Sequence, residues 1–189
     1  MAEAAVKNPF ALVIINPVAG FVNPQMMKRL INDHFKKAGW EIKIYQTEKD
    51  TELDNLVKLY IEKGVDLIVA VGGDGTIASV AAGMAGSTVP LGIIPSGTWN
   101  AIARHLMLPM LPIKALSLIT GPHHLRYLDL MSIGDSIHAM NLGVGFSAKM
   151  IKSTSRENKR KFGNIAYYLN LIKQGLGIQL TKYTVEADG

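Results

Sequence analysis

Cysteine is absent from this chain of 189 residues. Its absence excludes a disulfide framework and a thiolate metal site, and it allows a reducing compartment, so we expect a cytoplasmic protein. Charged residues are also few, at 19% of the chain, which excludes a protein made mainly of long, solvated, charged segments. Apolar residues make up 48%, enough for a core of normal size, and this excludes a disordered chain.

Long apolar runs are missing as well. A membrane-spanning helix needs about 20 apolar residues. The richest stretch, residues 106–119, is interrupted by Pro109, Pro112 and Lys114. No basic region precedes an apolar core at the N-terminus, so a signal peptide is not predicted. The net charge of +5 favours acidic partners such as phosphates, nucleic acid or an anionic membrane.

The first two thirds of the chain alternate strand-like and helix-like segments. The pattern predicts strands over residues 10–15, 41–45, 66–71 and 89–94, and helices over 25–37, 51–63, 77–85 and 99–106. Strands separated by helices of this length indicate βαβ units, whose crossovers are almost always right-handed. The sequence therefore predicts an α/β fold with a doubly wound parallel sheet.

The pattern changes near Gly121-Pro122. The segments predicted after it are strands over 125–132 and 136–142 joined by a turn at Gly134-Asp135, helices over 146–153 and 162–176, and a strand over 181–186. We expect an α/β domain over residues 1–122 and the beginning of a second, β-rich domain over 123–189. Asp188-Gly189 is a hairpin turn signal without a return strand, so we expect the second domain to be truncated.

Glycine marks three loops, each placed directly after a predicted strand. The sharpest is Gly72-Gly73-Asp74-Gly75-Thr76, which also opens a helix; the others are residues 95–100 and residues 16–20. In a parallel sheet, loops that follow strands lie at one edge, where doubly wound sheets bind ligands. Unpaired N–H groups at a helix start attract phosphate. Together the three loops favour a phosphate-binding site.

Asp74 is an unusual residue for such a loop, because a carboxylate and a phosphate repel each other. One explanation is a Mg²⁺ ion that bridges the two anions. Another is that Asp74 orders the loop by accepting hydrogen bonds from backbone N–H groups. A third is a plain strand-to-helix turn in which Thr76 serves as the cap.

The three loops and their flanking residues resemble the diacylglycerol kinase catalytic-domain family, which includes bacterial lipid kinases and the sphingosine and ceramide kinases. The resemblance rests on residues 14–20, 71–77 and 91–98 and covers most of residues 10–130. Residues 127–130 (Tyr-Leu-Asp-Leu) are similar to the start of the family's second, β-rich domain. The fold implied is that of the N-terminal domain of NAD kinases and diacylglycerol kinases.

The resemblance implies ATP as phosphoryl donor, Mg²⁺ as cofactor and a lipid alcohol of the diacylglycerol or sphingoid type as acceptor. Asp74 is the expected catalytic residue, as the organiser of Mg²⁺ and phosphates; no other metal ligand is assigned. The residues expected to bind the nucleotide are Asn16, Pro17, Val18, Ala19, Gly20, Thr47, Gly72, Gly73, Asp74, Gly75, Thr76, Ile77, Ala78, Gly97, Thr98 and Asn100. The resemblance places the catalytic base beyond Gly189, so we expect this chain to bind nucleotide without phosphorylating lipid.

The chain departs from the family pattern at two places. Ala78-Ser79 stand where the family often has Asn-Glu, and Trp99-Asn100-Ala101 stand where it often has Gly-Asn-Asp. The replaced acidic positions keep a non-catalytic, regulatory nucleotide-binding protein as an alternative. An NAD kinase-like enzyme is a second alternative, because it shares the Gly-Gly-Asp-Gly turn. The loops around Asn16 and Thr98 favour the lipid kinase over it.

A basic segment spans residues 149–161, with Glu157 as its only acid; its cations are Lys149, Lys152, Arg156, Lys159, Arg160 and Lys161. One hypothesis is peripheral contact with an anionic membrane, to which each cation contributes about 1 kcal/mol. The alternative is an ordinary solvated surface. Nucleic acid is not an expected partner, because no reader motif accompanies the charge. An unfinished sheet would expose a strand edge, so a homo-oligomer is also expected.

Overall fold

The computed structural model describes residues 8–19, 23–48, 51–139, 182 and 184–187. The chain divides into two units, Met1–Met140 and Asn141–Gly189, and the fold below is that of the first. Gly20, the basic segment and the helices predicted over 146–153 and 162–176 lie outside the described residues. The boundary predicted at residue 122 remains a prediction. The strand predicted over 181–186 is wrong for its described residues, 182 and 184–186, which have no regular structure.

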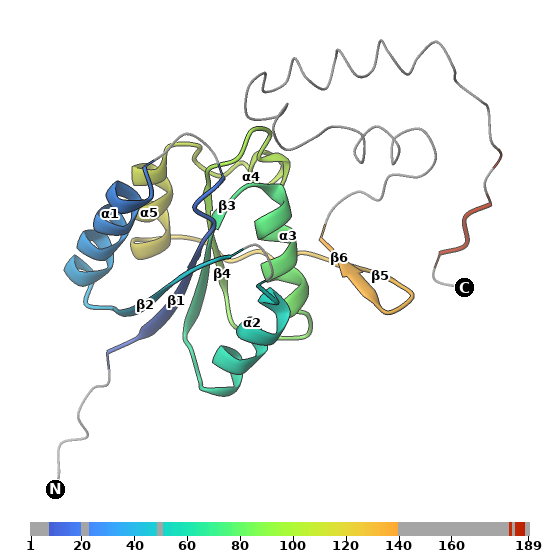
Figure 1. Cartoon of the computed structure of the whole chain (residues 1–189), viewed down its shortest axis with the longest axis horizontal. Helices are drawn as coiled ribbons and strands as arrows, with labels where there is room; N and C mark the ends of the chain where they lie inside the picture. Colours follow the sequence, from blue (N-terminus) through green and yellow to red (C-terminus); the bar gives the residue numbers. More distant parts are fainter. Residues whose placement is uncertain (1–7, 20–22, 49–50, 140–181, 183, 188–189) are drawn as a thin grey trace, which may run out of the picture. The chain divides into compact units, whose positions relative to one another are not determined.

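Four strands form one parallel sheet, in agreement with the predicted fold class (Figure 1). They are β1 (Phe10–Ile15), β2 (Glu41–Gln46), β3 (Leu67–Gly72) and β4 (Leu91–Pro95), in the order β2-β1-β3-β4. The register pairs Ile15 with Gln46 and Val71, and Gly72 with Pro95, so the carboxyl ends lie level. Every residue of β3 is buried, as expected for an inner strand covered on both faces.

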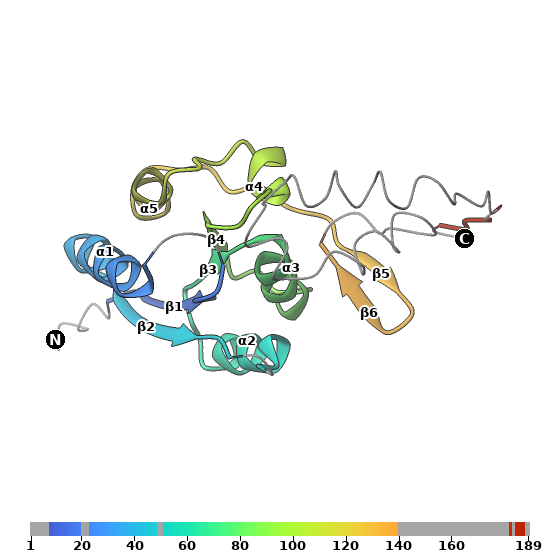
Figure 2. The same cartoon turned by 45° about the horizontal axis from the view of Figure 1, so that its top comes forward.

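Helices cover both faces of the sheet, as the side chains of β1 show. Ala11, Val13 and Ile15 pack in one core with residues of α1 (Pro24–Lys37) and α5 (Pro112–Thr120). Leu12 and Ile14 pack in the other, with residues of α2 (Leu53–Glu62), α3 (Asp74–Gly83) and α4 (Ala101–His105). Figure 2 shows the two groups on opposite sides of the sheet. The alternation along β1 therefore builds the doubly wound arrangement.

The direction of winding reverses between β1 and β3. From β1 the chain passes through α1 to β2 at one edge, then returns through α2 to β3 and β4 on the other side of β1. The helices that follow β1 and β3 thus cover opposite faces. The loop after β1 and the loop after β3 therefore lead to opposite faces of the sheet. A doubly wound sheet leaves room for a ligand at the point where two such loops separate.

The helix α5 was not predicted from the sequence, because the prolines of residues 106–119 indicated only interruptions of an apolar stretch. Pro112 occupies the first turn of α5, where a missing N–H costs nothing and the fixed φ suits the helix. Ala115 and Leu116 are buried and hold α5 on the sheet. Pro109 lies in the connector between α4 and α5.

A short antiparallel hairpin follows α5 in the chain. It consists of β5 (Met131–Ile133) and β6 (Ser136–His138), with the turn at Gly134-Asp135 as predicted. Gly134 has a φ of 57°, which explains glycine at this position. The first strand is shorter than predicted, because pairing begins at Met131 and residues 125–130 have no strand structure. The second ends at His138, which pairs with Met131, and residues 140–142 of its predicted range lie outside the described residues.

Met107 is the second residue after the end of α4, and its backbone is left-handed, with a φ of 54°. The N–H of Met107 donates to Arg104 O, and the N–H of Leu108 donates to Ala103 O. This hydrogen-bond pattern is a Schellman motif, in which glycine is the usual residue. The helices α1 and α2 do carry glycine after their ends, Gly39 and Gly64, both at positive φ.

We predict that Met107→Gly raises the free energy of unfolding by about 0.5–1 kcal/mol, because it removes the left-handed strain of a residue that bears a Cβ. Urea denaturation measures the change. Met26→Gly is the matched control: Met26 is also exposed but lies within α1, so glycine should destabilise there by about 1 kcal/mol. A loss of stability in both variants would contradict the prediction.

Candidate functional site

The candidate site lies at the carboxyl edge of the sheet, where four strands end side by side. The residues that follow β1, β2 and β4 extend the pairing by one backbone hydrogen bond each. These bonds run from Asn16 N to Val71 O (3.0 Å), from Thr47 N to Ile15 O (2.9 Å) and from Ser96 N to Gly72 O (2.9 Å). The structure therefore brings together Thr47 and the three glycine loops that the sequence analysis singled out.

The first turn of α3 presents backbone N–H groups without a side-chain cap. Gly73 is the N-cap and has no side chain to offer, and the first bond within the helix runs from Ile77 N to Gly73 O. The helix α1 differs, because Asn23 Oδ1 accepts from the N–H groups of its first turn. Of these two helix starts, only that of α3 keeps its donors for another acceptor.

Close packing explains two of the glycines in these loops. A Cβ on Gly97 would lie 2.5 Å from Gly73 Cα, and a Cβ on Gly72 would lie 2.6 Å from Thr76 Cβ. The glycine turn and the loop after β4 thus touch through their backbones at Gly73 and Gly97. Neither side chain nor backbone could be inserted between them without a shift of one loop.

Gly75 has no such explanation. A Cβ on Gly75 would meet nothing within 4 Å, its backbone is not in the left-handed region, and the residue is exposed at the second position of α3. Glycine in a helix costs about 1 kcal/mol relative to alanine. Folding therefore gives no reason for Gly75, whereas close approach of a ligand to the uncapped N–H groups would.

Asp74 reaches from α3 to the start of α4. Its Oδ1 accepts a hydrogen bond from Ile102 N at 3.1 Å, and α4 has no side-chain cap of its own. This contact realises the alternative in which Asp74 orders the loops by accepting a backbone N–H. No described residue donates to Oδ2 of Asp74. The role of Asp74 toward Mg²⁺ remains a prediction.

Asn16 fastens the first loop to α3. Its Nδ2 donates to Thr76 Oγ1 at 2.9 Å, and its Oδ1 accepts from Val18 N at 3.1 Å. Thr76 is buried, with 8% of its surface exposed, so its hydroxyl serves this contact rather than the solvent-facing edge. The hypothesis that Thr76 caps α3 is therefore wrong, because its side chain makes no cap hydrogen bond.

Asn100 closes the loop after β4 on itself. Its Oδ1 accepts from Gly97 N at 2.7 Å and its Nδ2 donates to Gly97 O at 2.9 Å. Its backbone is left-handed, with a φ of 48°, a conformation that asparagine tolerates better than most residues. Both polar atoms of this amide are therefore used within the loop. Thr98, two residues before it, is exposed.

The other predicted site residues differ in their surroundings. Pro17 and Ala19 are half-buried, Val18 is exposed, and Ala78 packs against the second core. Ile77 is fully buried in that core, so its side chain supports the helix rather than lining the edge. Whether these residues contact nucleotide remains a prediction.

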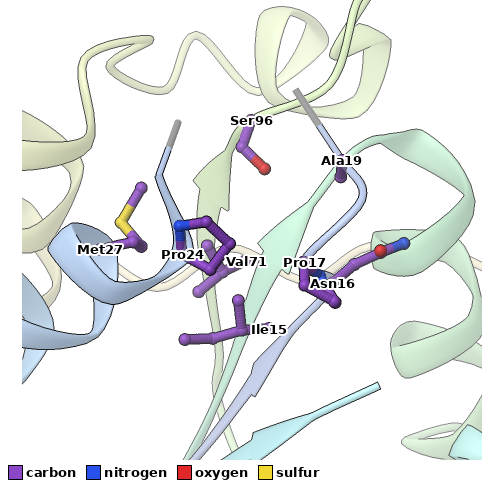
Figure 3. Close-up of a pocket in the computed structure, with 8 residues that line it drawn as sticks. All are labelled: Ile15, Asn16, Pro17, Ala19, Pro24, Met27, Val71 and Ser96. Atoms are coloured by element: carbon purple, nitrogen blue, oxygen red, sulfur yellow. The ribbon is translucent and has the colours of Figure 1, made fainter. Parts of the chain in front are cut away.

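A hollow opens beside the first loop, between α1 and the ends of β3 and β4 (Figure 3). Its lining is mostly apolar: Ile15, Asn16, Pro17, Ala19, Pro24, Met27, Val71 and Ser96. Asn16, Pro17 and Ala19 were predicted as site residues. Pro24 and Met27 were not predicted. They could have been found from the sequence, because the start of a predicted helix follows the first loop.

No group of three or more His, Cys, Asp or Glu side chains that could hold a metal ion occurs among the described residues. Mg²⁺ in phosphoryl-transfer sites is commonly bound by one or two carboxylates together with substrate phosphates and water. The single carboxylate of Asp74 beside an uncapped helix start fits an ion of this kind. It does not fit a metal cage made by the protein alone.

The comparisons with known proteins agree on one family. The model of the diacylglycerol kinase catalytic domain matches residues 10–133. A diacylglycerol kinase of Staphylococcus saprophyticus is 33% identical over 165 residues, which cover 84% of this chain and 52% of that protein. The uncharacterized protein sll0036 of Synechocystis is 31% identical over 188 residues, which cover 93% of this chain and 43% of that protein.

A solved structure extends the agreement to three dimensions. It is that of a diacylglycerol kinase from Bacillus anthracis, with a TM-score of 0.53 and 31% identity, over 61% of this chain and 44% of that one. The chain spans about half the length of the curated relatives it matches. The match over residues 10–133 includes all three glycine loops and the sheet that aligns them, and the chain belongs to the diacylglycerol kinase catalytic-domain family.

Proposed function

We propose that this chain binds ATP with Mg²⁺ at the carboxyl edge of its sheet and forms the donor half of a lipid kinase. The single observation that carries the proposal is Gly75, which folding does not require, at the uncapped start of α3. Backbone donors at a helix start favour a polyphosphate, and a residue without a side chain lets the phosphate come close. The family of the chain supplies the context of a kinase.

Asp74 is proposed as the carboxylate that faces Mg²⁺. Its Oδ1 is engaged by Ile102 N, and its Oδ2 is the oxygen left for the ion or for a water molecule bound to it. Mg²⁺ would neutralise charge on the phosphates. The protein itself would hold the two loops at the right separation, through the contact between Gly73 and Gly97.

The proposed acceptor is the hydroxyl group of a lipid alcohol. Its oxygen forms the new bond to the γ-phosphorus, the bond from that phosphorus to the β,γ-bridging oxygen breaks, and ADP leaves. The hydroxyl proton must go to a positioned base. We propose that this base lies beyond Gly189, so that the chain alone binds nucleotide but does not transfer phosphate.

The proposal predicts that ATP and ADP bind more tightly than AMP, and that Mg²⁺ strengthens the binding of ATP. Titration calorimetry with the three nucleotides measures this. Gly75→Ala should weaken ATP at least about tenfold while AMP changes little, because the added methyl group approaches the phosphates and not the nucleoside. Equal affinity for ATP and AMP, or equal weakening of both, would argue against a polyphosphate site.

Transfer is the second readout of the same proposal. Radiolabelled ATP with diacylglycerol, monoacylglycerol and sphingosine should give no labelled lipid with this chain and labelled lipid with a chain extended past Gly189. Labelling by this chain at a comparable rate would place the base within its 189 residues. Absence of labelling by the extended chain, despite ATP binding, would favour the regulatory alternative.

A further inference from the structure

The three glycine loops of the candidate site, residues 16–20, 72–76 and 95–100, contain no lysine or arginine. Their one charged residue is Asp74, which is negative. A nucleoside triphosphate is strongly anionic, and proteins commonly bind phosphate with a cationic side chain as well as with backbone donors. A cationic side chain that serves this site must therefore come from outside the loops.

Arg104 is a basic residue outside the loops that contacts one of them. It lies in α4, which follows the loop after β4 and lies beside α3 (Figure 1). Its Nε donates a hydrogen bond to Trp99 O at 2.9 Å. This contact places the guanidinium against the loop backbone, one residue beyond Thr98, which was predicted to bind the nucleotide.

The loop that holds this guanidinium is fastened to the first turn of α3 on both sides of Trp99. Before it, Gly97 packs against Gly73, since a Cβ on Gly97 would lie 2.5 Å from Gly73 Cα. After it, Ile102 N donates to Asp74 Oδ1 at 3.1 Å. Two residues of chain reach at most about 7 Å, so the Trp99 backbone lies within that distance of Gly97. The guanidinium is therefore held close to the uncapped start of α3.

Most of the donors of Arg104 are not used by the fold. The bond to Trp99 occupies one of the five N–H groups of the guanidinium. Among the described residues, none accepts from its two Nη groups and no carboxylate forms an ion pair with it. The side chain is exposed, so these donors are accessible to a ligand. Because the Nε bond already orients the planar group, a bound anion would have less side-chain freedom to remove.

We propose that Arg104 binds the polyphosphate of the nucleotide through the Nη groups of a guanidinium that the loop after β4 holds in place. A planar guanidinium can contact two phosphate oxygens at once, which the ammonium group of lysine cannot match in geometry. The start of α3 would supply neutral donors, and Arg104 would supply the charge. The inference rests on the proposed function and deepens it by assigning the cation of the site.

The proposed roles of Arg104 and Asp74 differ in their dependence on Mg²⁺. A guanidinium attracts phosphate directly, whereas a carboxylate can stabilise phosphate only through a cation between them. Removal of the charge of Arg104 should therefore weaken ATP in the absence of Mg²⁺ as well as in its presence. Removal of the charge of Asp74 should weaken ATP only when Mg²⁺ is present.

The experiment is titration calorimetry of the 189-residue chain with ATP, inorganic tripolyphosphate and AMP, each with and without Mg²⁺. Arg104→Gln should weaken ATP and tripolyphosphate at least about tenfold in both conditions, as expected for loss of a charged hydrogen bond. AMP should weaken less, because it carries a single phosphate. Lys114→Gln is the matched control: it removes an exposed cation of α5, and binding should stay as in the parent chain.

Salt separates a loss of charge from a misshapen loop. The effect of Arg104→Gln should shrink as the ionic strength rises, because salt screens an exposed charge, whereas a distorted loop would weaken binding at every ionic strength. Arg104→Lys keeps the charge but not the planar fork, so we expect a smaller loss of about threefold. Thermal melts check the fold of each variant, and Arg104→Lys alone provides the test if Arg104→Gln does not fold.

Three outcomes would overturn the proposal. The first is parental affinity for ATP in a folded Arg104→Gln variant while Gly75→Ala still weakens ATP, which leaves the proposed function intact without Arg104. The second is equal weakening of ATP and AMP at every ionic strength, which would mean that Arg104 only shapes the loop through Trp99 O. The third is a parent chain that does not bind ATP, which removes the proposed function together with this assignment.

Discussion

Gly97→Ala is expected to lower the free energy of unfolding by about 3 kcal/mol, because the new methyl group cannot be accommodated by a change of rotamer. The added Cβ would lie 2.5 Å from Gly73 Cα and 2.9 Å from Asn100 Oδ1. The first neighbour is backbone, so one of the two loops must move. Urea denaturation followed by circular dichroism measures the loss.

Gly75→Ala is the matched control for this effect. It makes the same chemical change two residues from Gly73, where the methyl group meets nothing, and alanine suits a helix better. Its stability should be unchanged or higher by up to about 1 kcal/mol. Equal destabilisation of both variants would show that the two loops are not in contact as described.

Asp74→Ala and Asp74→Asn should separate the two roles of this carboxylate. Alanine removes the acceptor of Ile102 N and should cost about 1–2 kcal/mol of stability, as loss of a helix cap does. Asparagine keeps a carbonyl oxygen and should cost less than about 1 kcal/mol. Both variants remove the charge, so in both the Mg²⁺-dependent part of ATP affinity should fall.

Calorimetry with and without Mg²⁺, together with urea denaturation, measures the two effects independently. The control is Asp66→Asn: the Asp66 carboxylate also accepts one backbone N–H, from Phe10, but at the amino end of the strands. It should leave ATP binding unchanged. Unchanged Mg²⁺ dependence in Asp74→Asn would mean that Asp74 only fastens α4 to the glycine turn.

The sheet could be predicted from the sequence because its signals are local. The run that becomes β3 is apolar at consecutive positions, and glycine ends the helices before β2 and β3. Pro112 shows the limit of such reasoning. Proline disfavours the interior of a helix but suits its first turn, and only the packing of Ala115 and Leu116 against the sheet decides between the two.

The candidate site was predictable only in its position. The loops could be placed at one edge because parallel strands align their ends, but contacts between loops depend on residues far apart in sequence. Asp74 and Ile102 are 28 residues apart, and Asn16 and Thr76 are 60 apart. No local pattern distinguishes Gly97, which packing requires, from Gly75, which it does not.

Charge is distributed unevenly along the chain. Residues 33–74 carry nine carboxylates and six lysines, a net charge of −3, whereas residues 75–128 carry Arg104, Lys114 and Arg126 without a carboxylate, a net charge of +3. The first range supplies β2, α2 and β3, and the second supplies α3, β4, α4 and α5. Exposed charges are screened over about 8 Å at physiological salt. The association of an anion with the second range should therefore follow the local charge there rather than the net charge of the chain, and it should weaken as ionic strength rises.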